Sequence, residues 1–270
     1  MLRLLHKIRR EHLANNALGK YLWYAVGEIL LVVVGILIAL QINNWNEERI
    51  EQKQITEYVL SLVGDLQSDI EMLVPVGKQV DHLIHLSSEL ASYMQGRSLA
   101  DINNIDLYVY TLNPLYRPFE WNRAALDQLK SSGALRQIKN QQLVKKISEY
   151  DALTRHLDQD YDNDDNNIRV AMNVALNVVN MNYPNWEQII IYDDDIAEDL
   201  LAAFFDSELY REIRRNDLAL LTDDINDVRH VVNTFLVLGS SLDARTRIEF
   251  PRLKANGLEI IELINAEYQQ

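Results

Sequence analysis

One uninterrupted apolar stretch limits what this chain can fold into. Residues 25–42 (AVGEILLVVVGILIALQI) contain a single ionisable side chain, the carboxyl of Glu28. A helix of about 20 mostly apolar residues crosses the ~30 Å hydrocarbon core of a lipid bilayer. Aromatic side chains, which favour the headgroup region, flank the stretch on both sides at Tyr21, Trp23 and Trp45. The sequence therefore predicts a transmembrane helix over residues 21–45, with these three aromatic residues as its interface belt.

The same stretch distinguishes a permanent anchor from a cleavable export signal. The apolar region of a signal peptide is shorter, about 7–15 residues, and it is followed by a cleavage site of small residues. Here the stretch leads into Leu40, Gln41 and Ile42, which is a poor context for cleavage. We therefore expect a signal anchor that stays in the membrane.

The charges on the two sides of the stretch predict its orientation. Residues 1–20 carry a net charge of +4 and the whole chain carries −14, so residues 21–270 carry −18. Flanks rich in Lys and Arg stay in the cytoplasm. We therefore expect a basic cytoplasmic stub (1–20), an anchor in the inner (cytoplasmic) membrane, and a periplasmic or extracellular domain over residues 46–270. This acidic domain lacks the basic surface that nucleic-acid binding requires.

Composition and periodicity predict that the domain is all-α. The chain has only 5 Pro and 9 Gly, and it has no Cys that could form a disulfide or a thiolate metal site. Apolar residues recur at three- and four-residue steps after the anchor, so we expect the transmembrane helix to continue as a stalk until Pro75. The predicted fold is a single N-terminal transmembrane helix continuing into a stalk, with an elongated helical-bundle ectodomain.

Further apolar stripes and end signals place the other helices. They predict long or medium helices over residues 80–93, 122–131, 143–179, 217–247 and 258–268, and short helices over 196–205 and 207–214. Gly133 can end a helix and Asn140 can cap the next one. Asp195 and Glu198 have the spacing of a capping box. The segment DLYVY (106–110) is the one place where a short extended stretch is expected.

Two stretches carry a resemblance to a known family. One is the anchor region YAVGEILLVVVGILIALQINNWNEE (24–48), and the other is AALDQLKSSGALRQIKNQQLVKKISEYDAL (124–153). Together they resemble an uncharacterised family of bacterial single-span envelope proteins, known only as a domain of unknown function. The resemblance implies a signal anchor followed by an envelope domain. It implies no activity and no catalytic residue.

The turn Ser131-Ser132-Gly133 has a structural and a functional interpretation. Because glycine tolerates the left-handed backbone conformation, the turn is readily explained as the end of a helix. Polar turns also serve as binding sites, so a ligand-contact loop is the alternative. We prefer the structural turn and keep Ser131, Ser132 and Gly133 as the candidate binding turn.

The acidic run DQDYDNDD (158–165) resembles the start of a calcium-binding EF-hand loop. Asn163 stands where that loop requires Gly, and Arg169 stands where it requires Glu. Apolar residues keep helical phase through the run, so we expect a solvated acidic face on one long helix, with a cation site as the alternative.

Metal and catalytic motifs are otherwise weak in this sequence. His82 and His85 stand one helical turn apart with Glu89 nearby, but no third and fourth ligand is evident, so they are interpreted as surface residues. The sequence contains no nucleophile elbow, no His-Glu-x-x-His motif and no phosphate-binding glycine loop. We therefore predict no enzymatic activity, no metal and no cofactor.

The carboxyl of Glu28 lies on one face of the predicted transmembrane helix. That face, which we call the packing seam, consists of Tyr24, Glu28, Leu31, Gly35, Ala39 and Ile42. Gly35 and Ala39 are a small-xxx-small pair that lets two helices approach closely. A membrane carboxyl is a functional candidate by default, although Glu28 lies one turn from Tyr24 and could instead reach the interface.

Two main classes of function are compatible with these features. The preferred one is a membrane-anchored, non-enzymatic helical interaction or scaffold module that assembles with itself or with another membrane protein. The alternative is a ligand-sensing ectodomain that signals through a membrane partner. A weaker alternative is the single-span rod of an ion-driven motor, in which Glu28 would carry the charge.

Overall fold

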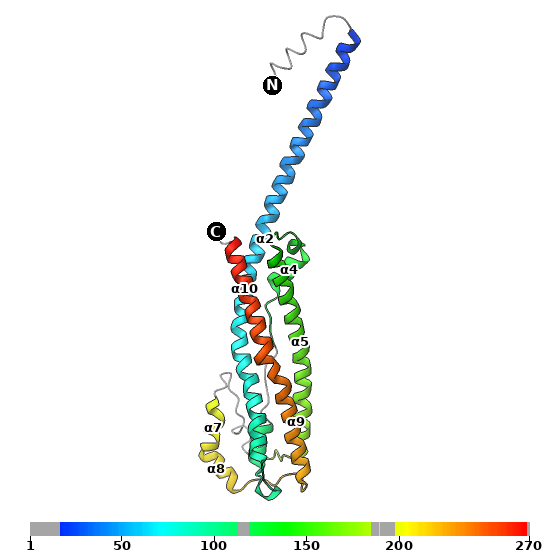
Figure 1. Cartoon of the computed structure of the whole chain (residues 1–270). Helices are drawn as coiled ribbons and strands as arrows, with labels where there is room; N and C mark the ends of the chain where they lie inside the picture. The colour runs from blue at the N-terminus through cyan, green and yellow to red at the C-terminus, as the bar shows by residue number, and fades with distance from the viewer. Residues whose placement is uncertain (1–16, 113–118, 185–188, 190–197, 269–270) are drawn as a thin grey trace. The chain divides into compact units, whose positions relative to one another are not determined.

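The structure of the chain is a computed structural model that describes residues 17–112, 119–184, 189 and 198–268. It divides into two parts, residues 1–57 and 58–270, and each is described by itself. All regular secondary structure in the described residues is helical, and they contain no strand (Figure 1). The prediction of an all-α chain is therefore confirmed.

In the first part, helix α2 (Ala17–Met94) has mostly exposed side chains over residues 21–50. Every residue from 21 to 50 is exposed except Ala25, which is intermediate. The most apolar window of the helix has a mean hydropathy of 2.5 and no buried residue. Near the exit, Asn43 Nδ2 donates to Glu47 Oε1 over 2.8 Å, and the Arg49 guanidinium lies 5.9 Å from the Trp45 ring centre. By length and composition, α2 is the one helix among the described residues that could cross a membrane.

The second part contains the remainder of α2 and the other helices. They are η1 (Leu99–Asp101), α3 (Asn104–Thr111), α4 (Ala124–Ser131), η2 (Ala134–Arg136), α5 (Gln141–Ala175), α7 (Glu198–Asp206), α8 (Glu208–Arg215), α9 (Ile225–Ala244), the π-helical turn η3 (Arg245–Glu249) and α10 (Phe250–Tyr268). Side chains cap several of them by accepting hydrogen bonds from backbone N–H groups of the first turn. Asn140 Oδ1 accepts from Leu143 N over 3.1 Å at the start of α5, and Ser207 Oγ accepts from Tyr210 N over 3.0 Å at the start of α8.

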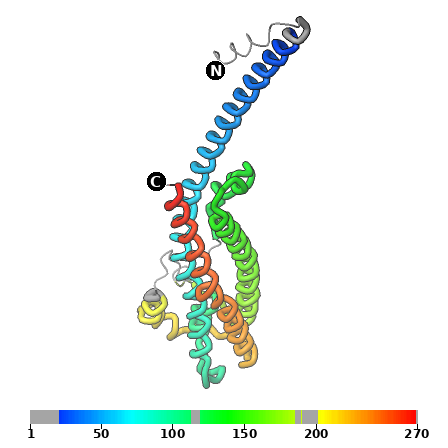
Figure 2. Tube along the Cα trace, turned by 45° about the horizontal axis from the view of Figure 1, so that its top comes forward, coloured from blue at the N-terminus to red at the C-terminus, as the bar shows by residue number. Residues whose placement is uncertain are grey.

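The core of the second part lies between residues 58–94 of α2, helix α5 and the continuous run α9–η3–α10, which lie side by side (Figures 1 and 2). Their apolar stripes face inward, and Val59, Leu143, Phe235 and Ile260 are each 1% exposed or less. Two glycines bring the backbones close. A Cβ at Gly239 of α9 would lie 3.0 Å from Ser87 Cβ, and one at Gly257 of α10 would lie 3.2 Å from Ile70 Cδ1.

Pro75 does not end the first helix, contrary to the sequence-based prediction. Helix α2 continues through Pro75 to Met94, so the stripe predicted as a second helix over residues 80–93 belongs to the same helix. A proline inside a helix removes one hydrogen bond and crowds the preceding turn. Leu73 and Val76 are buried on either side of it. The burial of these two side chains and of the later turns of α2 stabilises the helix by more than the proline destabilises it.

Two other predictions of secondary structure were wrong. The segment 106–110 is not extended but lies in α3, in which all eight residues are buried. A helix buried on every side shows no polar face, and its periodicity is then invisible in the sequence. Helix α9 begins at Ile225 rather than at Asp217, because Leu221 N donates to Val178 O over 2.8 Å in a non-helical link. The predicted capping box at Asp195 lies outside the described residues.

Replacing glycines with alanine tests the close approach of α2 and α9. We expect Gly239→Ala to lower the free energy of unfolding by about 1–3 kcal/mol, because the new methyl group would press on the backbone-anchored Ser87 Cβ. Gly64→Ala is the matched control. That exposed helical position has nothing within 4 Å of a new Cβ, so it should gain about 0.5–1 kcal/mol from helix propensity.

Chemical denaturation of the full chain in detergent micelles, followed by circular dichroism, measures both values. Equal effects of the two substitutions would contradict the close approach at Gly239.

Candidate functional site

The six packing-seam residues all lie on the uncovered part of α2. Tyr24, Leu31 and Ile42 are 60–70% exposed, at 64%, 70% and 61%. A Cβ added at Gly35 would meet nothing within 4 Å, so a second helix could approach the backbone there. The belt residues Tyr21, Trp23 and Trp45 are also exposed. The structure holds one chain, and the seam and the belt stay predictions.

The turn at Ser131, Ser132 and Gly133 has the geometry of a helix end. Gly133 has φ +79°, the left-handed conformation that favours glycine. Ser132 Oγ donates to Gln128 O over 2.7 Å and Ser131 Oγ to the same oxygen over 3.4 Å. Both hydroxyl protons are thus used within the turn, which agrees with the structural interpretation.

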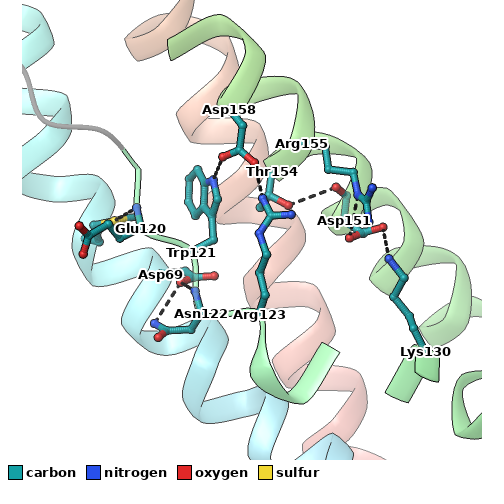
Figure 3. A network of polar contacts seen from close by, with 11 residues as sticks. Asp69, Glu120, Trp121, Asn122, Arg123, Lys130, Asp151, Thr154, Arg155 and Asp158 are labelled. Carbon is teal, nitrogen blue, oxygen red and sulfur yellow. Dashed lines mark hydrogen bonds and ion pairs between the residues drawn. The ribbon is translucent and has the colours of Figure 1, made fainter. Parts of the chain in front are cut away.

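A polar clamp holds the segment before α4 against two helices (Figure 3). The buried carboxylate of Asp69 in α2 accepts from Asn122 N over 2.8 Å and Asn122 Nδ2 over 3.2 Å, and Tyr150 of α5 donates its hydroxyl to it over 2.7 Å. Burial raises the pKa of Asp69, while these hydrogen bonds oppose the rise. The clamp therefore ties α2, α5 and the connecting segment together through one carboxylate.

The clamp continues at the start of the acidic run on α5. Trp121 Nε1 donates to Asp158 Oδ1 over 2.8 Å, and the guanidinium of Arg123 pairs with Asp158 Oδ2 (Figure 3). Nearby, Lys130 Nζ lies 2.8 Å from Asp151 Oδ2. These polar groups are matched with each other, so the clamp is explained as architecture rather than as a binding site.

A second polar group, the Arg245 cluster, surrounds the π-helical turn η3. It consists of His156, Asp160 and Asp164 of α5 together with Arg245 and Glu249 of η3. Arg245 Nε donates to Asp164 Oδ2 over 2.9 Å and Arg245 Nη1 donates to Glu249 Oε2 over 2.6 Å. Arg245 Nη1 also lies 3.3 Å from Asp160 Oδ2. One guanidinium thus faces three carboxylates.

The cluster is buried on one side and open on the other. The side chains of Asp164 and Arg245 are 2% and 9% exposed, whereas that of His156 is 57% exposed. Burial opposes the charge on Arg245, but the hydrogen bonds and charges of Asp164 and Glu249 outweigh it and raise the Arg245 pKa. Burial also raises the pKa of Asp160, and Arg245 opposes that rise. Buried charges of this kind are stable only when they are paired.

The prediction of a solvated acidic face on residues 158–165 was therefore wrong for two of its acids. Asp160 and Asp164 face Arg245, whereas the side chain of Asp158 pairs with Arg123 and is still 44% exposed. Arg245 lies 81 residues from Asp164 and 85 residues from Asp160 in the chain, so no local pattern could reveal these pairs. The sequence around Arg245 did indicate that this arginine is buried. Arg245 follows the buried residues Leu238 and Leu242 of α9 at helical spacing. His156 and Glu249 carried no such signal.

The histidine pair that was interpreted as a surface feature lies elsewhere on α2. His85 Nε2 is 3.8 Å from Glu89 Oε1, and the two side chains are 55% and 45% exposed. His85 and Glu89 therefore form an ordinary i, i+4 pair on the surface of the helix.

Asp164→Asn tests whether the buried pair with Arg245 stabilises the fold. We expect it to lower the free energy of unfolding by about 2–4 kcal/mol, because it keeps the shape of the side chain but leaves the guanidinium with fewer charges to balance it. The neighbouring Asp165→Asn is the control. Its pair with Arg169 is exposed, so the loss should be under about 1 kcal/mol. Thermal and chemical unfolding of the two variants measure these free energies. A similar loss of stability in both variants would refute a special role for the buried pair.

Comparison with protein-family models gives one match. A model described as a family of unknown function (DUF6090) matches residues 28–152, which include most of α2, helices α3 and α4, and the first turns of α5. Comparisons with curated proteins and with solved structures gave no match. The match confirms the resemblance of this chain to an uncharacterised family, and the matched range begins at Glu28 of the seam and includes Asp69 and Asn122 of the clamp.

Proposed function

We propose that this protein is a membrane-anchored, non-enzymatic helical interaction or scaffold module of the bacterial envelope. The observation that carries the proposal is the uncovered apolar segment of α2, with aromatic residues at both ends and no buried residue in its most apolar window. Such a surface is unfavourable in water, and a lipid bilayer removes it from water. The segment then serves as a signal anchor in the cytoplasmic membrane.

The anchor is also the proposed assembly surface. Gly35 and Ala39 leave room for a second helix to approach the backbone of α2, and association within lipid depends on such close packing. Glu28 lies on the same face and would be paired or protonated within the assembly. The partner is a second copy of this chain or another membrane protein.

The polar groups of the clamp are compatible with a non-enzymatic role. In the clamp, Asp69 and Asp158 are engaged by hydrogen-bond donors from the chain itself. General acids and bases need a reactive group that can reach a substrate. A ligand-sensing ectodomain is the second candidate, and the observation that favours it is the half-open Arg245 cluster.

Protease accessibility tests the proposed orientation. Protease added to intact spheroplasts should remove the chain beyond Trp45 and leave the basic stub protected, because positively charged flanks remain in the cytoplasm. Mass spectrometry of the protected fragment measures the boundary. Permeabilised spheroplasts are the control, in which the stub should also be digested. Protection of residues 46–270 in intact spheroplasts would refute the orientation.

Substitutions in the packing seam test assembly. Gly35→Leu should abolish crosslinking between copies or to a partner in native membranes, because it pushes the helix backbones apart. Val33→Leu lies off the seam and should crosslink as the wild type does. Glu28→Gln keeps shape and hydrogen bonding, so assembly should survive at a cost of about 0.6 kcal/mol if the carboxyl is a hydrogen-bonding group.

Loss of assembly in Glu28→Gln would show that ionisation of the carboxyl matters. Equal crosslinking of Gly35→Leu and the wild type would remove the seam from the proposal.

A further inference from the structure

We propose that His156, Asp160 and Glu249 bind a divalent transition-metal ion of the Zn²⁺ type. His156 and Asp160 stand one turn apart on α5, and Glu249 ends the π-helical turn η3 that packs against them. One ligand atom from each residue lies within 4.8 Å of the other two. An ion held by them would join two helices that are far apart in the sequence.

The spacing of the ligand atoms fits a tetrahedral ion. His156 Nε2 lies 3.2 Å from Asp160 Oδ2 and 3.6 Å from Glu249 Oε1. Zinc binds imidazole nitrogen and carboxylate oxygen at about 2.0–2.2 Å, so two ligands at the tetrahedral angle lie roughly 3.3–3.5 Å apart. These two spacings lie on either side of that value, and the third, between Asp160 and Glu249, is within 4.8 Å. The three groups are close enough to hold one ion without a large movement.

The charge of the Arg245 cluster calls for a further cation. Asp160, Asp164 and Glu249 supply three negative charges and Arg245 supplies one positive charge. Arg245 directs two of its N–H groups to Asp164. A divalent ion would neutralise the two negative charges that these four side chains leave, and uncompensated buried charge is costly.

Asp160 Oδ2 gives independent support for the same position. This atom is buried and receives no hydrogen bond of good geometry, although His156 and Arg245 lie 3.2 and 3.3 Å away. Buried acceptors are nearly always satisfied, so an exception requires an explanation. An ion between His156 and Glu249 would use this lone pair.

The surroundings have the features of a supported metal site. Arg245 Nη1 donates to Glu249 Oε2, the carboxylate oxygen that does not face His156, and so orients the ligand oxygen Oε1. Single π-helical turns within α-helices occur frequently at functional sites. The half-exposed imidazole of His156 gives an ion access from solvent, and a fourth ligand can be water.

The ligand set favours zinc-like ions over calcium or magnesium. Calcium takes six to eight oxygen ligands and magnesium requires near-octahedral oxygen coordination. One imidazole and two carboxylates instead suit Zn²⁺ and its spectroscopic substitute Co²⁺. This site differs from the rejected EF-hand interpretation, since it shares only Asp160 with the acidic run.

Titration of the full chain in detergent micelles, without a histidine tag, tests the proposal. Co²⁺ absorption reports tetrahedral coordination, and competition of Zn²⁺ with a chromophoric chelator measures affinity. We expect one equivalent of metal per chain, with at least tenfold weaker binding in His156→Ala and in Glu249→Gln. Two substitutions are the matched controls. His85→Ala removes a similarly exposed histidine of α2, and Asp162→Asn removes an exposed acid of α5, the helix that carries His156 and Asp160.

Circular dichroism of each variant checks that the helices are intact, and His156→Ala, whose side chain is mostly exposed, is the variant expected to fold normally. Metal binding that is lost in His156→Ala and retained in both controls supports the site. The proposal is overturned if the wild type shows no saturable binding, or if His156→Ala binds as tightly as the wild type.

Discussion

The close packing of α2 against α9 and α10 determines how the other helices of residues 58–270 can be placed. At Gly239 and Gly257 the backbones approach so closely that a methyl group would meet a neighbouring side chain at 3.0–3.2 Å. Helix α5 completes this core through Tyr150, whose ring also lies 3.5 Å from a Cβ built on Gly257. Because interiors are packed at high density, a close approach at two points constrains the whole length of the helices between them.

Buried polar groups then specify which faces of these helices meet. Asp69 requires donors in a region that excludes water, and Asn122 and Tyr150 supply them from two other parts of the chain. Arg245 requires acceptors in the same way, and Asp164 and Glu249 supply them. A shift of either helix by one turn would leave a buried charge unmatched, which costs more than a lost apolar contact. The buried polar pairs therefore fix the positions of the helices relative to one another along their axes. Apolar packing alone would be less specific.

The proposed functions use different parts of the chain. Anchoring and assembly depend on residues 21–45, where the apolar surface is uncovered and Gly35 leaves space beside the backbone. Metal binding depends on His156, Asp160 and Glu249 in the second part. A site that links α5 to η3 would stabilise the packing of those helices when the ion is present. That would give the ligand-sensing alternative a definite ligand class, while the scaffold proposal does not require it.

The helical class, the apolar segment of α2 and several helix ends could be predicted from the sequence alone. Those features depend on local periodicity and on single capping residues such as Asn140 and Ser207, which act within one turn. Three features could not be predicted in this way: α2 passes through Pro75, residues 106–110 are helical, and Asp160 and Asp164 face Arg245. In each case the deciding energy comes from burial or pairing with residues distant in the chain. The sequence near each of these residues does not identify such partners. Whether a helix face is buried or solvated depends on which distant residues pack against it.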